Sequence, residues 1–219
     1  MYLLSFVRRL FRIPATFIYA QGAEDFIAGH YLRHLFNVER GTYVDVGCNR
    51  PLRNSNTFDF YKLGWRGIAI DANMDLIAEF QAVRKQDICV TSAVSDEQRD
   101  AFFYKSDEDL VSTIDEDRLI EWKKHWEFNE GEKVVTRTLT SILDDYSLVD
   151  IDLLSIDVEG HDLQVLRGLD LTKYRPKLII IEIHDLANVE GSPIYVYLTE
   201  HGYELKAFAI LSAFFVRRG

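Results

Sequence analysis

Short apolar runs alternate with amphipathic segments along the first half of the chain. The runs are rich in β-branched residues and are bounded by glycine or polar residues, which favours strands. The predicted strands are 42–46, 67–71 and 88–94. The amphipathic segments place apolar residues three or four positions apart, which favours helices. The predicted helices are 24–36, 57–63 and 74–82. This β-α-β-α-β order predicts a parallel sheet with helices on both faces.

The same alternation returns after an acidic stretch that begins near residue 95. Strands are predicted at 152–157 and 177–182, and helices at 163–169 and 194–201. Residues 203–216 indicate two strands with no helix between them, which is typical of the S-adenosylmethionine-dependent methyltransferase fold. A nicotinamide-binding Rossmann domain would continue with another crossover helix. The sequence therefore predicts an α/β, doubly wound, mostly parallel seven-stranded Rossmann-like sheet with a terminal antiparallel strand.

The chain of 219 residues is long enough for one sizeable core. We expect a basic apolar N-terminal segment at 1–20, and a single domain at 21–219 with an insertion at about 95–133. Apolar residues within 1–13 share one helical face, so this part is either an ordinary packing segment or a weak membrane-surface contact. It lacks the cleavage site of a signal peptide, and no apolar run is long enough to span a bilayer.

Composition narrows the partners and the compartment. The 25 basic and 35 acidic residues give a net charge of -10, which disfavours nucleic acid as a partner. Cys48 and Cys89 cannot form a disulfide framework, and no Cys/His cluster suggests zinc. These features fit a reducing compartment, and we expect a cytoplasmic protein, with peripheral membrane contact as the alternative.

The first candidate site follows the first two predicted strands. Gly47 comes directly after a strand, where a glycine lets the backbone approach a ligand. The full GxGxxG pattern of a pyrophosphate-binding loop is absent. Asp71 ends the next strand, 24 residues after Gly47, and its carboxylate can accept both hydroxyls of a ribose. Capping of the following helix is a compatible second role for Asp71.

The second candidate site lies at the ends of two later strands. Asp157 and Glu159 leave the strand on one side, and His161 begins the following helix. Glu182 and His184 end the next strand and also share a side. Their oxygen and nitrogen atoms suit Mg²⁺ or Mn²⁺, or a general base for proton removal. A solvated acidic rim without chemistry is the remaining interpretation.

With these residues in place, the chain resembles the FkbM-type methyltransferase family over most of its length. Asp45-Val-Gly-Cys-Asn49 is similar to the family's cofactor loop. The stretch 153–166, LLSIDVEGHDLQVL, is similar to its most specific signature. Residues 51–71 are similar to the pattern P…S.T..FY..GW.GI in a subgroup, and 21–25, QGAED, to the SQxGED opening. Ala23 departs from the glycine of that opening.

The resemblance implies in-line methyl transfer from S-adenosylmethionine to an oxygen, in this family often a sugar or glycan hydroxyl. It implies that the methionine end of the cofactor is contacted by Asp45, Gly47, Cys48 and Asn49. The ribose would be contacted by Asp71, Ala72 and Asn73, and the adenine by Ser92 and Ala93. Asp157 would lie near the methyl-donor end. The candidate catalytic bases are Glu159, His161 and His184. The candidate ligands of a metal, Mg²⁺ or Mn²⁺, are Asp157, Glu182 and His184.

A carbohydrate or glycan is therefore the expected acceptor. The acidic stretch at 95–126 is either a solvated excursion or a cap over the acceptor pocket, with Ser112, Thr113 and Trp122 as candidate sugar contacts. An NAD-dependent oxidoreductase and a non-catalytic scaffold are the rival functions. The missing glycines argue against the first, and the carboxylates at the sheet edge argue against the second.

Overall fold

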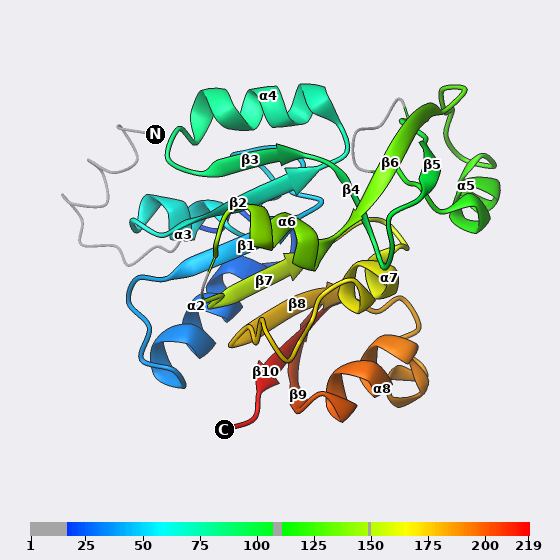
Figure 1. The fold of residues 1–219 in the computed structure, drawn as a ribbon. Coiled ribbons are helices and arrows are strands. Elements are labelled where there is room, and N and C mark those ends of the chain that lie inside the picture. The colour runs from blue at the N-terminus through cyan, green and yellow to red at the C-terminus, as the bar shows by residue number, and fades with distance from the viewer. Residues whose placement is uncertain (1–16, 107–110, 149) are drawn as a thin grey trace.

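A seven-stranded sheet forms the centre of the molecule (Figure 1). The computed structural model describes residues 17–106, 111–148 and 150–219. The strand order is β3-β2-β1-β7-β8-β10-β9. The strands of this sheet are β1 (Thr42–Val46), β2 (Arg66–Asp71), β3 (Ile88–Thr91), β7 (Leu153–Ile156), β8 (Leu178–Glu182), β9 (Tyr203–Ala209) and β10 (Ser212–Arg217). Successive strands are added toward one edge of the sheet from β1 to β3, and toward the other edge from β7 onward. The switch point therefore lies between β1 and β7, in the middle of the sheet.

The pairing confirms the predicted fold class. Strands β3, β2, β1, β7 and β8 are parallel to their neighbours. Strand β10 runs antiparallel to both β8 and β9. Only Ile210 and Leu211 separate β9 from β10, so the chain ends in a hairpin without a crossover helix, as predicted.

Helices cover both faces of this sheet. Helices α6 (Leu139–Asp145), α7 (Asp162–Arg167) and α8 (Pro193–Glu200) pack on one face, in a cluster with the even-numbered residues of β1 and β2. The other face is covered by α2 (Glu24–His34), α3 (Phe58–Lys62) and α4 (Met74–Val83). The strands are therefore buried on both sides, which explains their nearly continuous apolar sequences.

Side-chain caps fix where several helices begin. The Asn73 side chain accepts a hydrogen bond from the backbone N–H of Asp75 at the start of α4. Thr138 accepts one from Ser141 at the start of α6. Each cap supplies an acceptor to a backbone N–H that has no partner within its helix. The cap of α4 lies directly after β2, so it also fixes the loop that follows Asp71.

The predicted strand 88–94 is wrong as one continuous element. The backbone N–H of Ser92 still donates to the Asp71 carbonyl at 2.9 Å, but the chain then leaves the central sheet. Residues Ala93–Ser95 form β4, which pairs with β6 (Glu132–Thr138) in a second sheet. A run of β-prone residues does not reveal that its two halves have different neighbours, because periodicity records the type of element and not the strand that it pairs with.

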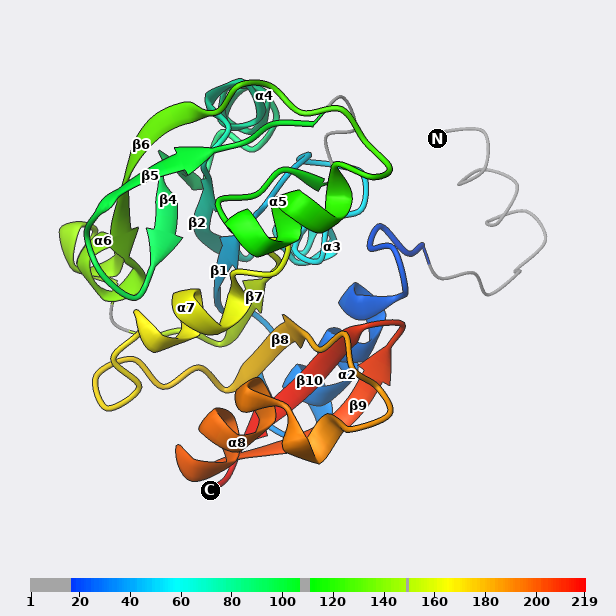
Figure 2. The same ribbon diagram turned by 90° about the vertical axis from the view of Figure 1, so that its right-hand side faces the viewer.

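The second sheet and one helix stand beyond the carboxyl ends of the parallel strands (Figures 1 and 2). This sheet has the order β4-β6-β5, with β5 at Asp100–Phe103, and α5 covers Glu116–Trp122. The acidic stretch that begins near residue 95 thus contains regular structure, and we call residues 100–126 the cap. The division of the chain at residues 20 and 21, and the boundaries of the insertion at about 95–133, stay predictions.

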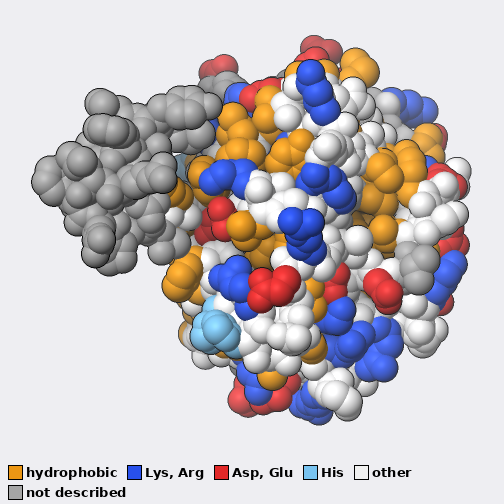
Figure 3. All heavy atoms as spheres, turned by 90° about the vertical axis from the view of Figure 1, so that its left-hand side faces the viewer, with side chains coloured by type: hydrophobic (Ala, Val, Ile, Leu, Met, Phe, Trp, Pro, Cys, Tyr) orange, Lys and Arg blue, Asp and Glu red, His pale blue; other side chains and the backbone are white. Residues whose placement is uncertain are grey.

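The face of the molecule opposite the second sheet carries Lys and Arg side chains scattered among hydrophobic and acidic ones (Figure 3). The predicted apolar helical face within 1–13 lies outside the described residues. In the part of the chain that the structure describes, no helix combines the length and hydrophobicity needed to cross a bilayer.

Candidate functional site

A cavity of about 330 Å³ opens at the carboxyl ends of the parallel strands. This is within the size range of small-molecule sites, and in open α/β sheets ligands bind at this edge. The cavity runs from the end of β2 to the ends of β7 and β8. Its described lining includes the following residues from both predicted sites: Gly47, Asn49, Asp71, Ala72, Asn73, Ser92, Ala93, Asp157, Glu159, His161 and Glu182.

Gly47 begins the cavity wall after β1. Its φ of 76° lies in the left-handed region, and a Cβ atom there would be 1.8 Å from the Asp157 carbonyl oxygen. A side chain at this position would therefore push β1 and β7 apart. The backbone N–H groups of Gly47 and Cys48 both donate to the Ile70 carbonyl, at 2.9 and 3.1 Å. The glycine lets the loop fold tightly over the adjoining strand ends.

Asp71 joins two loops at the end of β2. Its Oδ2 accepts the backbone N–H of Asn49 at 3.1 Å, and its Oδ1 accepts that of Asn73 at 2.8 Å. Burial raises the pKa of Asp71, whereas these backbone hydrogen bonds lower it. The carboxylate has about four lone-pair sites, so these backbone donors do not use all of them. The side chain is thus held in place and can still accept a ribose hydroxyl.

Apolar side chains form the part of the cavity beside Asp71. Ile70 and Leu76 line it from β2 and α4, while Val94 and Phe103 line it from β4 and β5. Ser92 and Ala93 lie in the same wall, where the chain passes from β3 to β4. An apolar slot with polar groups at its edge suits a planar heterocycle such as adenine.

Two of the residues predicted to bind cofactor lie outside the described lining of the cavity. Asp45 is buried on the other side of β1, where its Oδ2 accepts the Thr57 hydroxyl at 2.5 Å. Burial raises the pKa of Asp45 to about 6, despite this hydrogen bond. Cys48 is buried in an apolar cluster with Ala69, Ile77 and Phe80. Both residues can therefore act on a ligand only through the backbone that they support.

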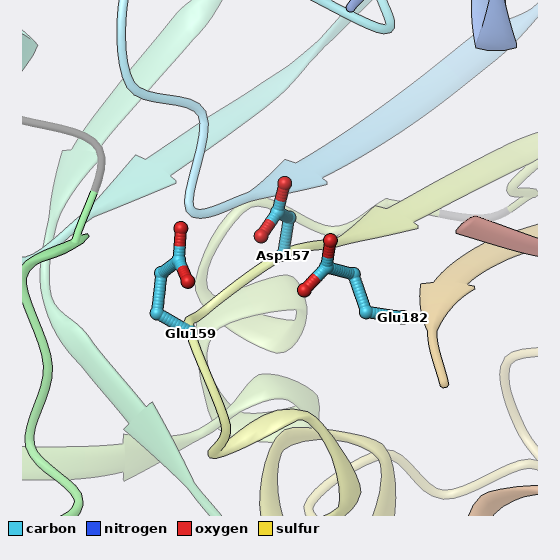
Figure 4. A group of neighbouring side chains, drawn as sticks. All are labelled: Asp157, Glu159 and Glu182. Atoms are coloured by element: carbon cyan, nitrogen blue, oxygen red, sulfur yellow. The ribbon is translucent and has the colours of Figure 1, made fainter. Parts of the chain in front are cut away.

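The ends of β7 and β8 bring three carboxylates together (Figure 4). Oxygens of Asp157, Glu159 and Glu182 all lie within 4.8 Å of one another. Strand β7 pairs in parallel with β8, so Asp157 and Glu182 come from neighbouring strand ends. Glu159 has a φ of 57°, which is uncommon for a residue with a side chain. We call these three residues the acidic cluster.

Burial and mutual repulsion perturb the acidic cluster. Burial is the largest cause that raises the pKa of all three carboxyls. It raises that of Asp157 well above its ordinary value, with the Glu182 charge as the next cause. The pKa of Glu159 rises to about 8 and that of Glu182 to about 7, against ordinary values near 4.5. Such a cluster favours a bound proton or cation.

His161 lies in the cavity wall but is 96% buried, since only 4% of it is exposed. Its Nε2 lies 2.8 Å from the Ser95 hydroxyl oxygen, which also lies 3.0 Å from Asp96 Oδ1. Its Nδ1 is buried with no hydrogen-bond partner among the described residues. Burial lowers the pKa of His161, so the imidazole is neutral at pH 7. An acceptor could reach neither ring nitrogen without rearrangement of the wall.

His184 is placed differently from the other candidate bases. Its Nε2 lies 3.4 Å from Glu182 Oε2, with about a third of the side chain exposed. Burial lowers its pKa, and the Arg118 charge lowers it further. His184 is absent from the described lining of the cavity and from the acidic cluster. Glu159 rather than His184 therefore completes the group of possible metal ligands around Asp157 and Glu182.

The cap contributes one wall of the cavity. Ser112 and Thr113 both line it, and the Thr113 hydroxyl donates to the Glu159 carbonyl at 3.2 Å. A Cβ atom on Gly160 would lie 2.6 Å from Arg118 Cγ, so α5 packs directly over the loop after β7. Trp122 contributes nothing to the lining that the structure describes, and its ring lies 6.2 Å from that of Trp126.

Sequence reasoning missed two polar residues in the cavity wall. Asn54, with a φ of 52°, reaches it from the loop after β1, and Gln21 reaches it from the segment before α2. The QGAED motif includes Gln21 but does not predict where its side chain lies. In that motif Ala23 has a φ of 74°, which explains why a glycine suits its position. The folded chain brings this segment to the end of β8, far from it in sequence.

A sheet of this order, which ends in an antiparallel hairpin and has a cavity at the carboxyl ends of its parallel strands, is typical of Rossmann-like methyltransferases. The model of the methyltransferase FkbM domain matches residues 45–205, which is more than half of the chain. The chain therefore belongs to this family of S-adenosylmethionine-dependent methyltransferases.

Two solved structures are similar to the chain at 10% sequence identity. An O-methyltransferase from Bacillus cereus in complex with SAH has a TM-score of 0.44, with 98% of this chain and 87% of that chain covered. The O-methyltransferase TomG from Streptomyces achromogenes has a TM-score of 0.45, with 97% and 86% covered. A comparison with curated proteins finds no match.

Proposed function

We propose that the protein transfers a methyl group from S-adenosylmethionine to a hydroxyl oxygen of a sugar or glycan. One observation carries this proposal: a single cavity joins Asp71, the candidate ribose ligand, to the acidic cluster beneath the cap. The cofactor supplies a methyl group on a positively charged sulfonium, which is a good leaving group. The protein must therefore chiefly align donor and acceptor and exclude water.

The residues around Gly47 and Asp71 fit the cofactor. Gly47 and Asn49 would hold its methionine end, and Asp71 its ribose hydroxyls, flanked by Ala72 and Asn73. Ser92 and Ala93 would border the adenine within the apolar slot. Asp157 lies at the turn from this part of the cavity to the acidic cluster, where its carboxylate would favour a positive charge.

Proton removal at the acceptor oxygen is assigned to Glu159. A sugar hydroxyl is a poor nucleophile at neutral pH, so a base must take its proton as the new bond forms. Glu159 lines the cavity, and its pKa of about 8 is near the working pH expected of an efficient base. His161 has both ring nitrogens covered, so we assign it to positioning of the loop that carries Glu159.

A metal ion is the alternative means of activating the hydroxyl. Three carboxylates within 4.8 Å are hard oxygen ligands of the kind that Mg²⁺ or Mn²⁺ prefers. Asp157, Glu159 and Glu182 would hold the ion, with His184 next to Glu182. Such an ion would lower the pKa of a bound hydroxyl. This alternative predicts that turnover is sensitive to chelators.

The cap would cover the acceptor. Ser112 and Thr113 present hydroxyl groups to the cavity, and sugar hydroxyls are suitable partners for them. Trp122 would contact the acceptor only if a glycan extended beyond the cavity along α5. Hydrogen exchange in residues 100–126 should slow when an acceptor binds, and unchanged exchange with a proven acceptor would contradict the proposed cap.

The test combines cofactor binding with methyl transfer. Calorimetry should show binding of S-adenosylhomocysteine (SAH), and labelled S-adenosylmethionine should label a member of a panel of sugars and glycans. Glu159→Gln should lower turnover about 10²- to 10⁴-fold with nearly unchanged SAH affinity, because only proton removal is lost. Glu190→Gln, at an exposed acid of the short helix Val189–Gly191, is the control.

The outcomes separate the two mechanisms. Loss of turnover in Glu159→Gln without sensitivity to chelators supports the direct base. Loss of turnover on chelation, with recovery in Mg²⁺ or Mn²⁺, supports the metal. A protein that binds neither SAH nor S-adenosylmethionine would contradict the proposed function altogether.

A further inference from the structure

Arg84 is completely buried at the C-terminal end of α4, outside the described lining of the cavity. Its Nε and Nη2 donate to the Pro51 carbonyl at 2.9 and 2.7 Å. Nη2 also donates to the Ser55 hydroxyl at 2.6 Å, and Nη1 to the Thr57 hydroxyl at 2.8 Å. The guanidinium carbon lies 4.4 Å from the centroid of the Phe80 ring. One buried cation thus binds the loop after β1 at three positions.

Thr57 extends this contact to β1. Its hydroxyl oxygen accepts the hydrogen bond from Arg84 and donates its own proton to Asp45 Oδ2 at 2.5 Å. One hydroxyl therefore connects a buried cation to a buried carboxylate. Hydrogen bonds of this charge-assisted kind are stronger and more directional than neutral ones. Asp45 belongs to the strand that ends at Gly47, so the network reaches the start of the loop as well.

The loop held in this way carries side chains into the cavity. Asn49 and Asn54 line the cavity, and both have positive φ, at 47° and 52°. Residues in this conformation need support from their surroundings. Asn56, two residues after Asn54, donates to the Ser155 hydroxyl of β7 at 3.0 Å. The anchor at 51 thus holds the turn from within, and those at 55, 56 and 57 hold it from its C-terminal side.

We propose that Arg84, Ser55 and Thr57 are positioning residues for cofactor binding, which hold the 49–54 turn in the shape that accepts the methionine end. This inference rests on the proposed function. It also gives a role to the serine and threonine within 51–71, where the sequence showed a pattern without a mechanism. A loop that has to be ordered during binding weakens affinity, because its conformational entropy is lost at that step.

The same arginine offers a control for stability alone. Asp87 lies 3.8 Å from Arg84 Nη1, and it accepts hydrogen bonds from the Tyr43 hydroxyl and the Gly67 backbone rather than from the loop. Asp87→Asn should lower the melting temperature and leave the Kd for SAH within about twofold of the parent. A loss of stability is thereby separated from a loss of loop position.

The test compares Thr57→Val with Thr57→Ser, because the first removes the hydroxyl at nearly constant volume and the second keeps it. Thr57→Val should raise the Kd for SAH, measured by calorimetry, about 10- to 100-fold. Thr57→Ser should remain within about threefold of the parent. Hydrogen exchange of residues 49–57 without ligand should be faster in Thr57→Val and unchanged in Asp87→Asn. If Thr57→Val does not fold, Ser55→Ala takes its place in the comparison with the parent, because it removes the hydroxyl that accepts a hydrogen bond from Arg84 Nη2.

Equal SAH affinity in the valine and serine variants would overturn the inference. So would a loss of affinity in Asp87→Asn as large as that in Thr57→Val. If the parent protein fails to bind SAH, the proposed function fails. The inference is then tested only by hydrogen exchange of residues 49–57. Equal exchange rates in all the variants would overturn it.

Discussion

The two ends of the cavity satisfy their charges in different ways. At the end of β2, the Asp71 carboxylate accepts two backbone N–H groups, and behind this end of the cavity the Asp45 carboxylate accepts the Thr57 hydroxyl. At the ends of β7 and β8, the three carboxylates of the acidic cluster face one another. Arg118 is the cation that lowers the pKa of both Glu159 and Glu182, and it does so from the cap.

This difference separates a preformed binding site from a reactive one. Groups that already have hydrogen-bond partners hold their shape before a ligand arrives, which limits the entropy lost on binding. Groups that repel one another are stabilised only when a proton or a cation joins them. We therefore expect substitutions at the first end to change cofactor affinity, and substitutions at the second to change turnover and the pH dependence of stability.

The largest expected effect joins the two ends. Gly47→Ala should abolish SAH binding and lower the free energy of unfolding by about 3 kcal/mol or more, because its Cβ would overlap the Asp157 carbonyl. Gly64→Ala is the matched control. The φ of Gly64 is also positive, at 93°, but a Cβ atom there would lie 3.6 Å from the nearest atom, Arg40 Nε. Chemical unfolding should show a loss of only about 1 kcal/mol there. Equal losses in the two variants would refute the close approach.

The next effect tests the preformed end. Asp71→Ala should weaken S-adenosylmethionine binding by about 1 to 3 kcal/mol, the scale of losing charge-assisted hydrogen bonds to ribose hydroxyls. Calorimetry measures this change directly. Asp75→Ala, which removes an exposed acid on α4, should leave affinity unchanged. Unchanged affinity in a folded Asp71→Ala variant would remove Asp71 from the cofactor site.

The reactive end should be visible in stability as a function of pH. In the folded protein the pKa of Glu182 is raised from 4.5 to about 7. Its contribution to the free energy of unfolding is therefore fully present below pH 4.5 and is lost as the pH rises through 7. Glu182→Gln should flatten this decline and be more stable than the parent at pH 8.5 by about 1 to 3 kcal/mol. Urea unfolding at pH 5, 7 and 8.5 provides the test, with Glu190→Gln as a control. Parallel pH profiles for Glu182→Gln and the parent would contradict the raised pKa of Glu182, which is due first to burial and then to the Asp162 charge.

The smallest effect concerns the segment that reaches the reactive end from before α2. Ala23→Gly should raise the free energy of unfolding by about 0.5 to 1 kcal/mol, because a φ of 74° is strained for alanine. Ala28→Gly, in the buried interior of α2, should have the opposite sign. Thermal melting of both variants gives the comparison. Destabilisation by Ala23→Gly would show that the methyl group contributes more through packing than it costs in strain.

Much of the fold was readable because its signals are local. The apolar runs at β1, β2, β7 and β8 are continuous, since both faces of those strands are covered. The hairpin of β9 and β10 follows from the short turn at Ile210 and Leu211. The split after Thr91 was not readable, because β4 pairs with residues of β6 that lie more than forty positions later.

The sequence by itself determined the fold class, the family, and the positions of Asp71, Asp157, Glu159 and Glu182 at strand ends. These follow from periodicity and motif, which depend on neighbours along the chain. The tertiary structure decided that Asp45 supports the loop from behind, that His161 is covered, and that Asn54 and Gln21 enter the cavity. Those facts depend on which side of a strand a loop folds over and which distant segment packs there, and through-space packing leaves no periodic signal in a single sequence.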